Sequence, residues 1–275
     1  MGRVRRSSGE RRVGHGGTLD PSATGVLPIF FGRATVLAEY LSAQGKAYTG
    51  EVVLGVTSST DDAEGELAVV PVPAGVDEAT VAATLATFVG THQQAPPAYS
   101  AVKIDGERSY KRARRGDQPS PAARPVVLEA ATLTGLRVEH GAPVASIDVV
   151  CGPGFYVRSL ARDLGRALGT AGHLRGLRRT RVGPLAVGEA ISLEEAEALG
   201  PELGARLLSP ALAVTSLIEV TVLPVDEGRL AHGIEISAPV PGGGAAFARA
   251  EDGRLLAIGE VLGGRFRPRR LVELG

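Results

Sequence analysis

Hydrophobic residues recur at helical spacing in several segments of the chain. Apolar side chains three or four positions apart share one helix face. Asp77 precedes one such segment and can cap it, and Ser192 with Glu195 forms a capping box that opens a short helix ending near residue 200. The spacing predicts three longer helices, over residues 34–44, 77–88 and 157–168.

Alternating apolar and polar positions predict strands between these helices. Residues 48–56 predict one strand, and residues 126–140 and 144–151 alternate around Gly141, which is typical of an antiparallel hairpin. After residue 222 the helical periodicity stops and glycines interrupt short apolar runs, so residues 222–275 predict a small β domain. Strands and helices mix without a regular βαβ rhythm. The chain therefore predicts an α+β fold with a mixed, largely antiparallel central sheet and flanking helices.

The composition is compatible with one large and one small domain. The chain has 275 residues, of which 44% are hydrophobic and only 4% aromatic, so aliphatic side chains must fill the core. We expect domains over 1–221 and 222–275. No apolar run is long enough to span a bilayer, and the first residues lack the apolar segment of a signal peptide. The single cysteine, Cys151, favours a reducing cytoplasm and argues against a metal site.

The charge distribution favours a nucleic-acid partner although the formal net charge is zero. Acidic residues gather in separate runs, at 61–66 and 194–197. Such segregation is typical of a face that binds phosphates. Arginine takes most basic positions throughout the chain, so a solvated face remains the alternative for any one cluster. Four basic clusters stand out: Arg3, Arg5, Arg6, Arg11 and Arg12; Arg108, Lys111, Arg112, Arg114 and Arg115; Arg175, Arg178, Arg179 and Arg181; and Arg265, Arg267, Arg269 and Arg270.

The candidate chemistry centres on residues 13–28, which read VGHGGTLDPSATGVLP. Glycines give this loop conformational freedom and remove side-chain bulk, which suits close approach to a ligand. Pro21 biases Asp20 toward an extended conformation, so one carboxylate lies on a stiffened turn behind a glycine run that carries His15. The alternative is an Asx turn, in which Asp20 bonds its own backbone.

This stretch resembles the active-site motif of TruB-type tRNA pseudouridine synthases, G-H-x-G-T-L-D-P-x-A-T-G-V-L-P. The resemblance implies that Asp20 is the catalytic residue and that His15 helps to extrude the target base.

Further segments extend the resemblance. It implies that Tyr48 stacks on the target uracil, that Arg158 pairs with the catalytic aspartate, and that Leu177 packs near the pocket. Tyr156 lies in the same segment as Arg158 and is expected to bind substrate. Residues of about 92–123 resemble an insertion that clasps RNA, and residues 222–275 an RNA-binding module of the PUA class.

The resemblance implies isomerisation of the T-loop uridine of tRNA, position 55 in the tRNA convention. The uracil must leave its stack to be reached. Asp20 attacks C1′ of the ribose or C6 of the base, or takes a proton in a glycal route, and the sequence leaves these three open. No cofactor or metal is needed, because bonds and charge balance within one nucleotide. We expect a cytoplasmic monomer that binds the T-arm of tRNA.

Two other functions and one departure from the family pattern accompany this prediction. Ser100 and Lys103 spell the S-x-x-K spacing of some acyl-transfer hydrolases, although the partner motifs are absent. A non-catalytic RNA-binding or tRNA-folding protein would explain the arginines but not the Asp20 loop. The family begins with a strand and a Lys-Pro motif that are missing here, so we expect either an upstream start or a copy without that strand.

Overall fold

The computed structural model describes residues 1–117 and 119–274, with side chains undescribed at 114, 273 and 274. The chain divides into two compact units, which are described separately. The first unit contains residues 1–18, 26–44 and 182–275, and the second contains residues 19–25 and 45–181.

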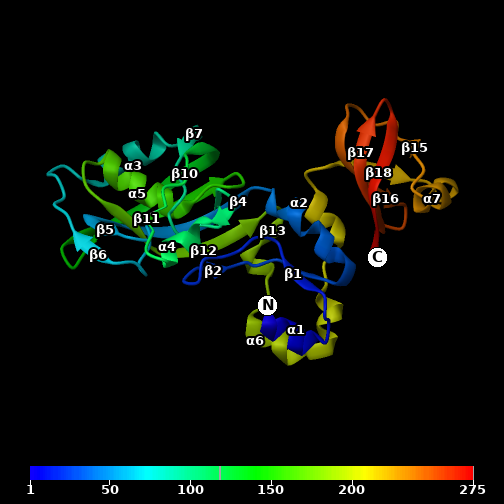
Figure 1. Ribbon diagram of the computed structural model, residues 1–275, viewed down its shortest axis with the longest axis horizontal. Helices are drawn as coiled ribbons and strands as arrows, with labels where there is room; N and C mark the ends of the chain where they lie inside the picture. The colour runs from blue at the N-terminus through cyan, green and yellow to red at the C-terminus, as the bar shows by residue number, and fades with distance from the viewer. Residues whose placement is uncertain (118, 275) are drawn as a thin grey trace. The chain divides into compact units, whose positions relative to one another are not determined.

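A mixed, largely antiparallel sheet forms the centre of the second unit (Figure 1). Its strands run in the order β12-β4-β11-β10-β7. Neighbours pair antiparallel from β4 to β7, whereas the two-residue β2 joins β12 in parallel. The expected α+β fold and the hairpin of β10 and β11 are confirmed. The strands are β2 (Thr24–Gly25), β4 (Lys46–Leu54), β7 (Gly90–Gln94), β10 (Arg124–Glu139), β11 (Ala142–Cys151) and β12 (Gly172–Val182).

Two helices build the core of this unit with the sheet. Helix α3 (Glu78–Ala86) begins after Asp77, whose side chain accepts from the Thr80 amide at 2.8 Å, as its capping position predicts. Helix α5 (Val157–Ala167) buries Leu160 and Leu164, which the helical spacing places on one face. Both helices contribute to one apolar cluster with the strands, so burial against the sheet fixes the position of α5. The remaining elements of the unit are short: β5 (Val56–Ser58), β6 (Leu67–Val69), β8 (Lys103–Ile104), β9 (Glu107–Arg108) and α4 (Ser109–Arg114).

The first unit opens with a short helix and a small hairpin. The helix expected over 34–44 is present as a 3-10 turn, Gly32–Leu37, followed by α2 (Ala38–Ser42). The capping box is confirmed, because Ser192 and Glu195 exchange side-chain and backbone hydrogen bonds. The elements up to residue 214 are α1 (Gly2–Ser8), β1 (Val13–His15), β3 (Ile29–Phe31), β13 (Leu185–Ala186), α6 (Leu193–Leu199) and 3-10 turns at Val187–Glu189, Gly200–Arg206 and Pro210–Val214.

The C-terminal part of the first unit is a five-stranded sheet in the order β14-β16-β17-β18-β15. A helix, α7 (Pro224–Ala231), interrupts the segment, so the expectation that helices stop after residue 222 is wrong. Leu230 is its buried residue, which gives too weak an apolar stripe to reveal the helix in the sequence. The strands are β14 (Ile218–Val222), β15 (Ile236–Ser237), β16 (Gly244–Ala250), β17 (Leu255–Leu262) and β18 (Arg265–Leu274).

Candidate active site

Asp20 lies on a tight turn before β2, in the second unit. Its main-chain oxygen accepts from the Ala23 amide at 3.0 Å, and Pro21 follows it in the turn. The carboxylate contacts Arg158 and is 37% exposed. The backbone closes the turn and the side chain points to Arg158, so the Asx-turn alternative does not describe this loop.

Arg158 faces Asp20 with two of its nitrogens. Nη2 donates to Oδ1 at 3.1 Å, and Nε lies 2.9 Å from Oδ2. The Arg158 side chain is only 6% exposed and comes from the first turn of α5. Its other contacts are the main-chain oxygens of Tyr99 and Thr60, at 3.0 and 3.1 Å. Since a buried guanidinium must be paired to be tolerated, this arrangement fixes the orientation of the two side chains.

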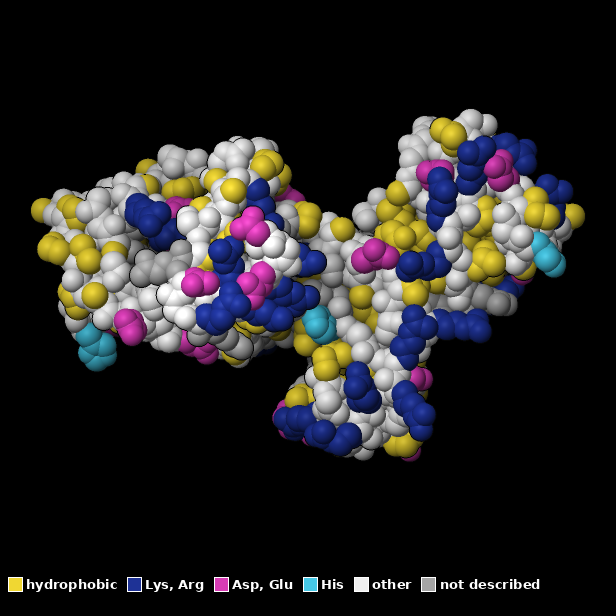
Figure 2. Space-filling model, in the orientation of Figure 1, with side chains coloured by type: hydrophobic (Ala, Val, Ile, Leu, Met, Phe, Trp, Pro, Cys, Tyr) yellow, Lys and Arg dark blue, Asp and Glu magenta, His cyan; other side chains and the backbone are white. Residues whose placement is uncertain are grey.

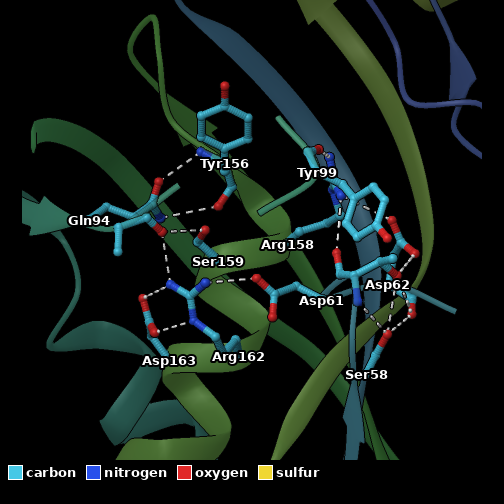
Figure 3. Close-up of polar contacts among 12 residues, drawn as sticks. Ser58, Asp61, Asp62, Gln94, Tyr99, Tyr156, Arg158, Ser159, Arg162 and Asp163 are labelled. Carbon is cyan, nitrogen blue, oxygen red and sulfur yellow. Dashed lines mark hydrogen bonds and ion pairs between the residues drawn. The ribbon is translucent and has the colours of Figure 1, made fainter. Parts of the chain in front are cut away.

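Asp62 is a third member of this site that the sequence did not reveal. Its Oδ2 lies 3.2 Å from Arg158 Nη1, and its side chain is largely buried (Figure 3). The hydroxyl of Thr60 and the amide of Glu64 donate to Oδ1 of Asp62. Arg158 therefore lies between two carboxylates, of which the Asp20 carboxylate is the more exposed.

Tyr48 lies on β4 in the same unit. Burial in the first place raises the pKa of Tyr48 to about 12, and the negative charge of Asp20 adds to this rise. The phenol therefore stays neutral at neutral pH and offers an aromatic face with one hydroxyl. Arg179, which is 1% exposed, hydrogen-bonds to Tyr48 and so belongs to this site rather than to a solvent-exposed basic surface.

Leu177 lies on β12, beside the loop of Asp20. Together with Asp20 and Arg158 it lines one small pocket, with free space of about 10 Å³, which is room for about one water molecule. Strand β2 pairs with β12 at Arg179, where Gly25 has φ +102°, and a Cβ at Gly25 would overlap the Arg179 carbonyl. Only glycine allows this close approach of the two backbones.

Tyr156 does not direct its ring toward the carboxylates. Its backbone is held by Gln94, which accepts from the Tyr156 amide at 2.9 Å and donates to its carbonyl at 3.1 Å. The ring points away from Arg158 in Figure 3 and lies under the Arg124 guanidinium, 5.5 Å from the ring centre. The predicted contact with substrate stays a prediction.

His15 belongs to the first unit, at the end of β1, where it pairs with Ile29 of β3. Its Nδ1 is buried and has no hydrogen-bond partner among the described residues. A buried polar atom without a partner costs free energy, so it is available to a ligand that supplies one.

We expect His15→Ala to slow uridine isomerisation roughly tenfold to a hundredfold, and His15→Gln to keep much of the activity. The role that the resemblance implies for His15, extrusion of the target base, needs size and polarity rather than proton transfer, and unstacking costs a few kcal/mol. Single-turnover tritium release from C5-labelled uridine measures this effect. Collapse of both variants, together with loss of a histidine titration from the rate profile, would instead indicate acid–base chemistry.

Many arginines of the predicted basic clusters form ion pairs. Arg175 contacts Glu51 and Glu139, and basic and acidic side chains lie next to each other at several places on the visible face (Figure 2). Part of the positive charge counted in the sequence is thus paired locally with acidic side chains. The side chain of Arg114 lies outside the described residues. Further cluster members in ion pairs are Arg3, Arg112, Arg115, Arg265, Arg267, Arg269 and Arg270.

The S-x-x-K pair does not form a second reaction centre. Ser100 is buried, whereas Lys103 is exposed on β8, so the two side chains do not share an accessible pocket. Among the described residues, no cluster of histidine, cysteine and carboxylate side chains is suited to hold a metal ion. Within the same residues, no helix combines the length and apolar character that crossing a membrane requires.

Family models and curated relatives match nearly the whole chain. Residues 5–157 match the N-terminal domain of the TruB family of pseudouridylate synthases, and residues 158–227 match a C-terminal domain of tRNA pseudouridylate synthase B. A protein of Thermobifida fusca named tRNA pseudouridine synthase B is 44% identical over 98% of this chain and 91% of its own length. A protein of the same name from an Arthrobacter species is 42% identical over 98% of this chain and 90% of its own length.

Solved structures share the fold at low sequence identity. A Cbf5–Nop10–Gar1 complex contains a chain that matches with a TM-score of 0.74 and 22% identity, over 98% of this chain and 79% of that chain. A chain in an H/ACA ribonucleoprotein bound to a substrate RNA matches with a TM-score of 0.72 and 20% identity, over 98% and 78%.

Proposed function

Because the chain belongs to the TruB family of pseudouridylate synthases, we propose that it isomerises the T-loop uridine of tRNA, position 55, to pseudouridine. One observation carries the assignment to this site: the half-exposed carboxylate of Asp20 is held by two nitrogens of the buried Arg158. A carboxylate oriented by a fixed cation and open on one side is suited to attack a carbon or to accept a proton.

The reaction balances within one nucleotide. The N1–C1′ glycosidic bond breaks, the uracil rotates, and a new bond joins C5 to C1′. C5 then loses its proton and N1 ends protonated. Asp20 acts at C1′, at C6, or as a base in the glycal route, and each of these roles needs the ionised carboxylate. We assign Tyr48 the stacking contact with the base, Leu177 the wall of the binding site and His15 the extrusion of the base. Tyr156 is assigned a contact with substrate outside the pocket of Asp20.

A base bound at this pocket covers the exposed side of the Asp20 carboxylate, which is part of the pocket lining. Leu177 contributes to this lining from β12. The bound base therefore excludes water from the Asp20–Arg158 pair, which strengthens the electrostatic contacts there.

We further propose that residues 222–275 act as a PUA-like RNA-binding module beside a catalytic domain of residues 1–221. Residues of about 92–123 clasp the T-arm: they contain the β8–β9 hairpin and α4, which carry Arg108, Lys111 and Arg112. Arg108 and Lys111 are exposed and can track phosphates. The proposed enzyme is a monomer, and its tRNA substrate and its single cysteine favour the cytoplasm.

We expect the wild-type protein to release tritium from a tRNA transcript labelled at C5 of its uridines, and a U55C transcript to release none. Loss of the C5 proton accompanies the new C5–C1′ bond, so the label reports turnover at the target uridine. Filter binding of both transcripts is the control. Equal release from U55C would overturn the position assigned, and binding without any release would favour the non-catalytic alternative.

A further inference from the structure

Two arginines one turn apart on α5 meet two adjacent aspartates of one loop. Arg158 Nη1 lies 3.2 Å from Asp62 Oδ2, and Arg162 Nη1 donates to Asp61 Oδ2 at 2.7 Å (Figure 3). Residues four apart lie on the same helix face, so α5 presents two guanidiniums to the loop. Consecutive carboxylates can match them only if the loop backbone directs both side chains toward α5.

The backbone of Asp61 provides that geometry. Asp61 has φ +62°, in the left-handed region that few residues other than glycine, asparagine and aspartate adopt. Its carbonyl accepts from the Leu174 amide of β12 at 3.0 Å, and Asp62 forms a parallel bridge with Leu174. The left-handed turn thus lies between β12 and α5, directly before the carboxylate that contacts Arg158.

All three nitrogens of the Arg162 guanidinium donate hydrogen bonds within the second unit. Its Nε donates to Asp163 Oδ1 at 2.9 Å, its Nη2 to the Ala95 carbonyl at 2.9 Å, and its Nη1 to Asp61. The side chains of Arg162 and Asp61 are each 15% exposed. Three anchored bonds leave the guanidinium one orientation, which makes it a rigid support for the turn.

Stability does not explain a charge at Asp61. Burial raises the pKa of Asp61 even though Arg162 acts in the opposite direction. The ionised carboxylate is therefore less favourable in the folded protein than in water, and the pair does not fully offset its burial. The pair does impose a geometry on the turn between β12 and α5.

We infer that Arg162 and Asp61 are positioning residues for the reaction: their ion pair fixes the left-handed turn that presents Asp62 to Arg158, and Arg158 in turn orients Asp20. This inference rests on the proposed role of Asp20. In this arrangement two arginines of α5 contribute to the site: Arg158 contacts Asp20 directly, and Arg162 holds the turn of Asp61 and Asp62.

The main test is Arg162→Gln, measured by single-turnover tritium release and by tRNA binding. We expect the rate constant to fall about tenfold to a hundredfold, because small misplacements of reacting groups have effects of this size. The dissociation constant for tRNA should stay unchanged. Arg166→Gln is the matched control: this side chain lies one turn further along α5, is 70% exposed, and should leave the rate unchanged.

Coupling to Asp62 separates positioning from general destabilisation. If Arg162 acts through Asp62, adding Arg162→Gln to Asp62→Asn should lower the rate by less than twofold further. Two independent losses that multiply in the double variant would overturn the inference.

Asp61→Asn covers the case in which Arg162→Gln fails to fold. Asparagine tolerates the left-handed conformation and removes only the charge. At a temperature at which the variant is fully folded, we expect a rate at least tenfold lower. A rate that falls only in proportion to the folded fraction, or stays at the wild-type value, would overturn the inference.

Asp20→Asn in the same assay separates the two claims. If Asp20→Asn abolishes release while Arg162→Gln reacts at the wild-type rate, the positioning role alone is wrong. If Asp20→Asn releases tritium normally, both the catalytic assignment and the positioning role are wrong.

Discussion

Asp20→Asn is expected to lower tritium release by at least about ten-thousandfold, to background, while tRNA binding persists. The amide keeps the shape of the side chain and one acceptor for Arg158, but it neither attacks carbon nor accepts a proton usefully at neutral pH. Removing a negative charge near an anionic substrate does not weaken their electrostatic attraction. Single-turnover release and filter binding on the same transcript measure the two effects.

Asp77→Asn is the matched control for this prediction. Asp77 is exposed at the start of α3 and asparagine caps a helix as well as aspartate does, so the same chemical change there should leave release and binding at wild-type values. Substantial release by Asp20→Asn would remove Asp20 from the chemistry. Loss of binding together with release would show that Asp20 maintains the shape of the loop instead.

Arg158→Lys is expected to lower the single-turnover rate by about a hundredfold or more, although the charge is conserved. Three guanidinium nitrogens contact Asp20, Asp62 and the carbonyls of Thr60 and Tyr99, and one ammonium cannot reproduce these directions. An unsatisfied buried carbonyl costs roughly 1–3 kcal/mol, so Tm should fall as well.

Arg166→Lys is the control, because its side chain is exposed on the same helix and pairs only with Asp163 among the described residues. Rates are compared at a temperature at which both variants are fully folded. A folded Arg158→Lys enzyme with the wild-type rate would show that the two-nitrogen contact with Asp20 is dispensable.

The parts of the fold that the sequence predicts are those encoded by local signals. Asp77 and Ser192 mark the starts of their helices in the sequence, because a capping side chain accepts a hydrogen bond from the amide only three residues further on. The hairpin around Gly141 follows from alternation on both sides of one turn. Helix α7 is missing from the prediction because it buries a single large side chain and so lacks an apolar stripe. The local signal that was available is Pro224 at the first helical position, followed by Asp226 and Glu227 in the first turn.

Long-range contacts explain what the sequence could not reveal about the site. Asp61 and Asp62 lie in an acidic run whose composition is typical of a solvent-exposed turn. Their partners, Arg162 and Arg158 on α5, are about 100 residues away in the sequence. The available signal was on the helix: Arg158 and Arg162, four residues apart and close to its apolar face, require buried anions. Arg179 likewise lies in a basic run that is typical of an exposed surface, but its side chain is buried beside Tyr48.

Strand β2, which follows the turn of Asp20, pairs with β12, which carries Leu177. The Asp20 turn and β12 are therefore coupled and should move together. Gly25 leaves no space between the two backbones, so a displacement of β12 carries the turn of Asp20 with it. The distance between the Asp20 carboxylate and Leu177 then changes little when β12 shifts. To transfer this site to another scaffold, or to change its base specificity, the loop of Asp20 with β2 and the strand β12 must therefore be exchanged together.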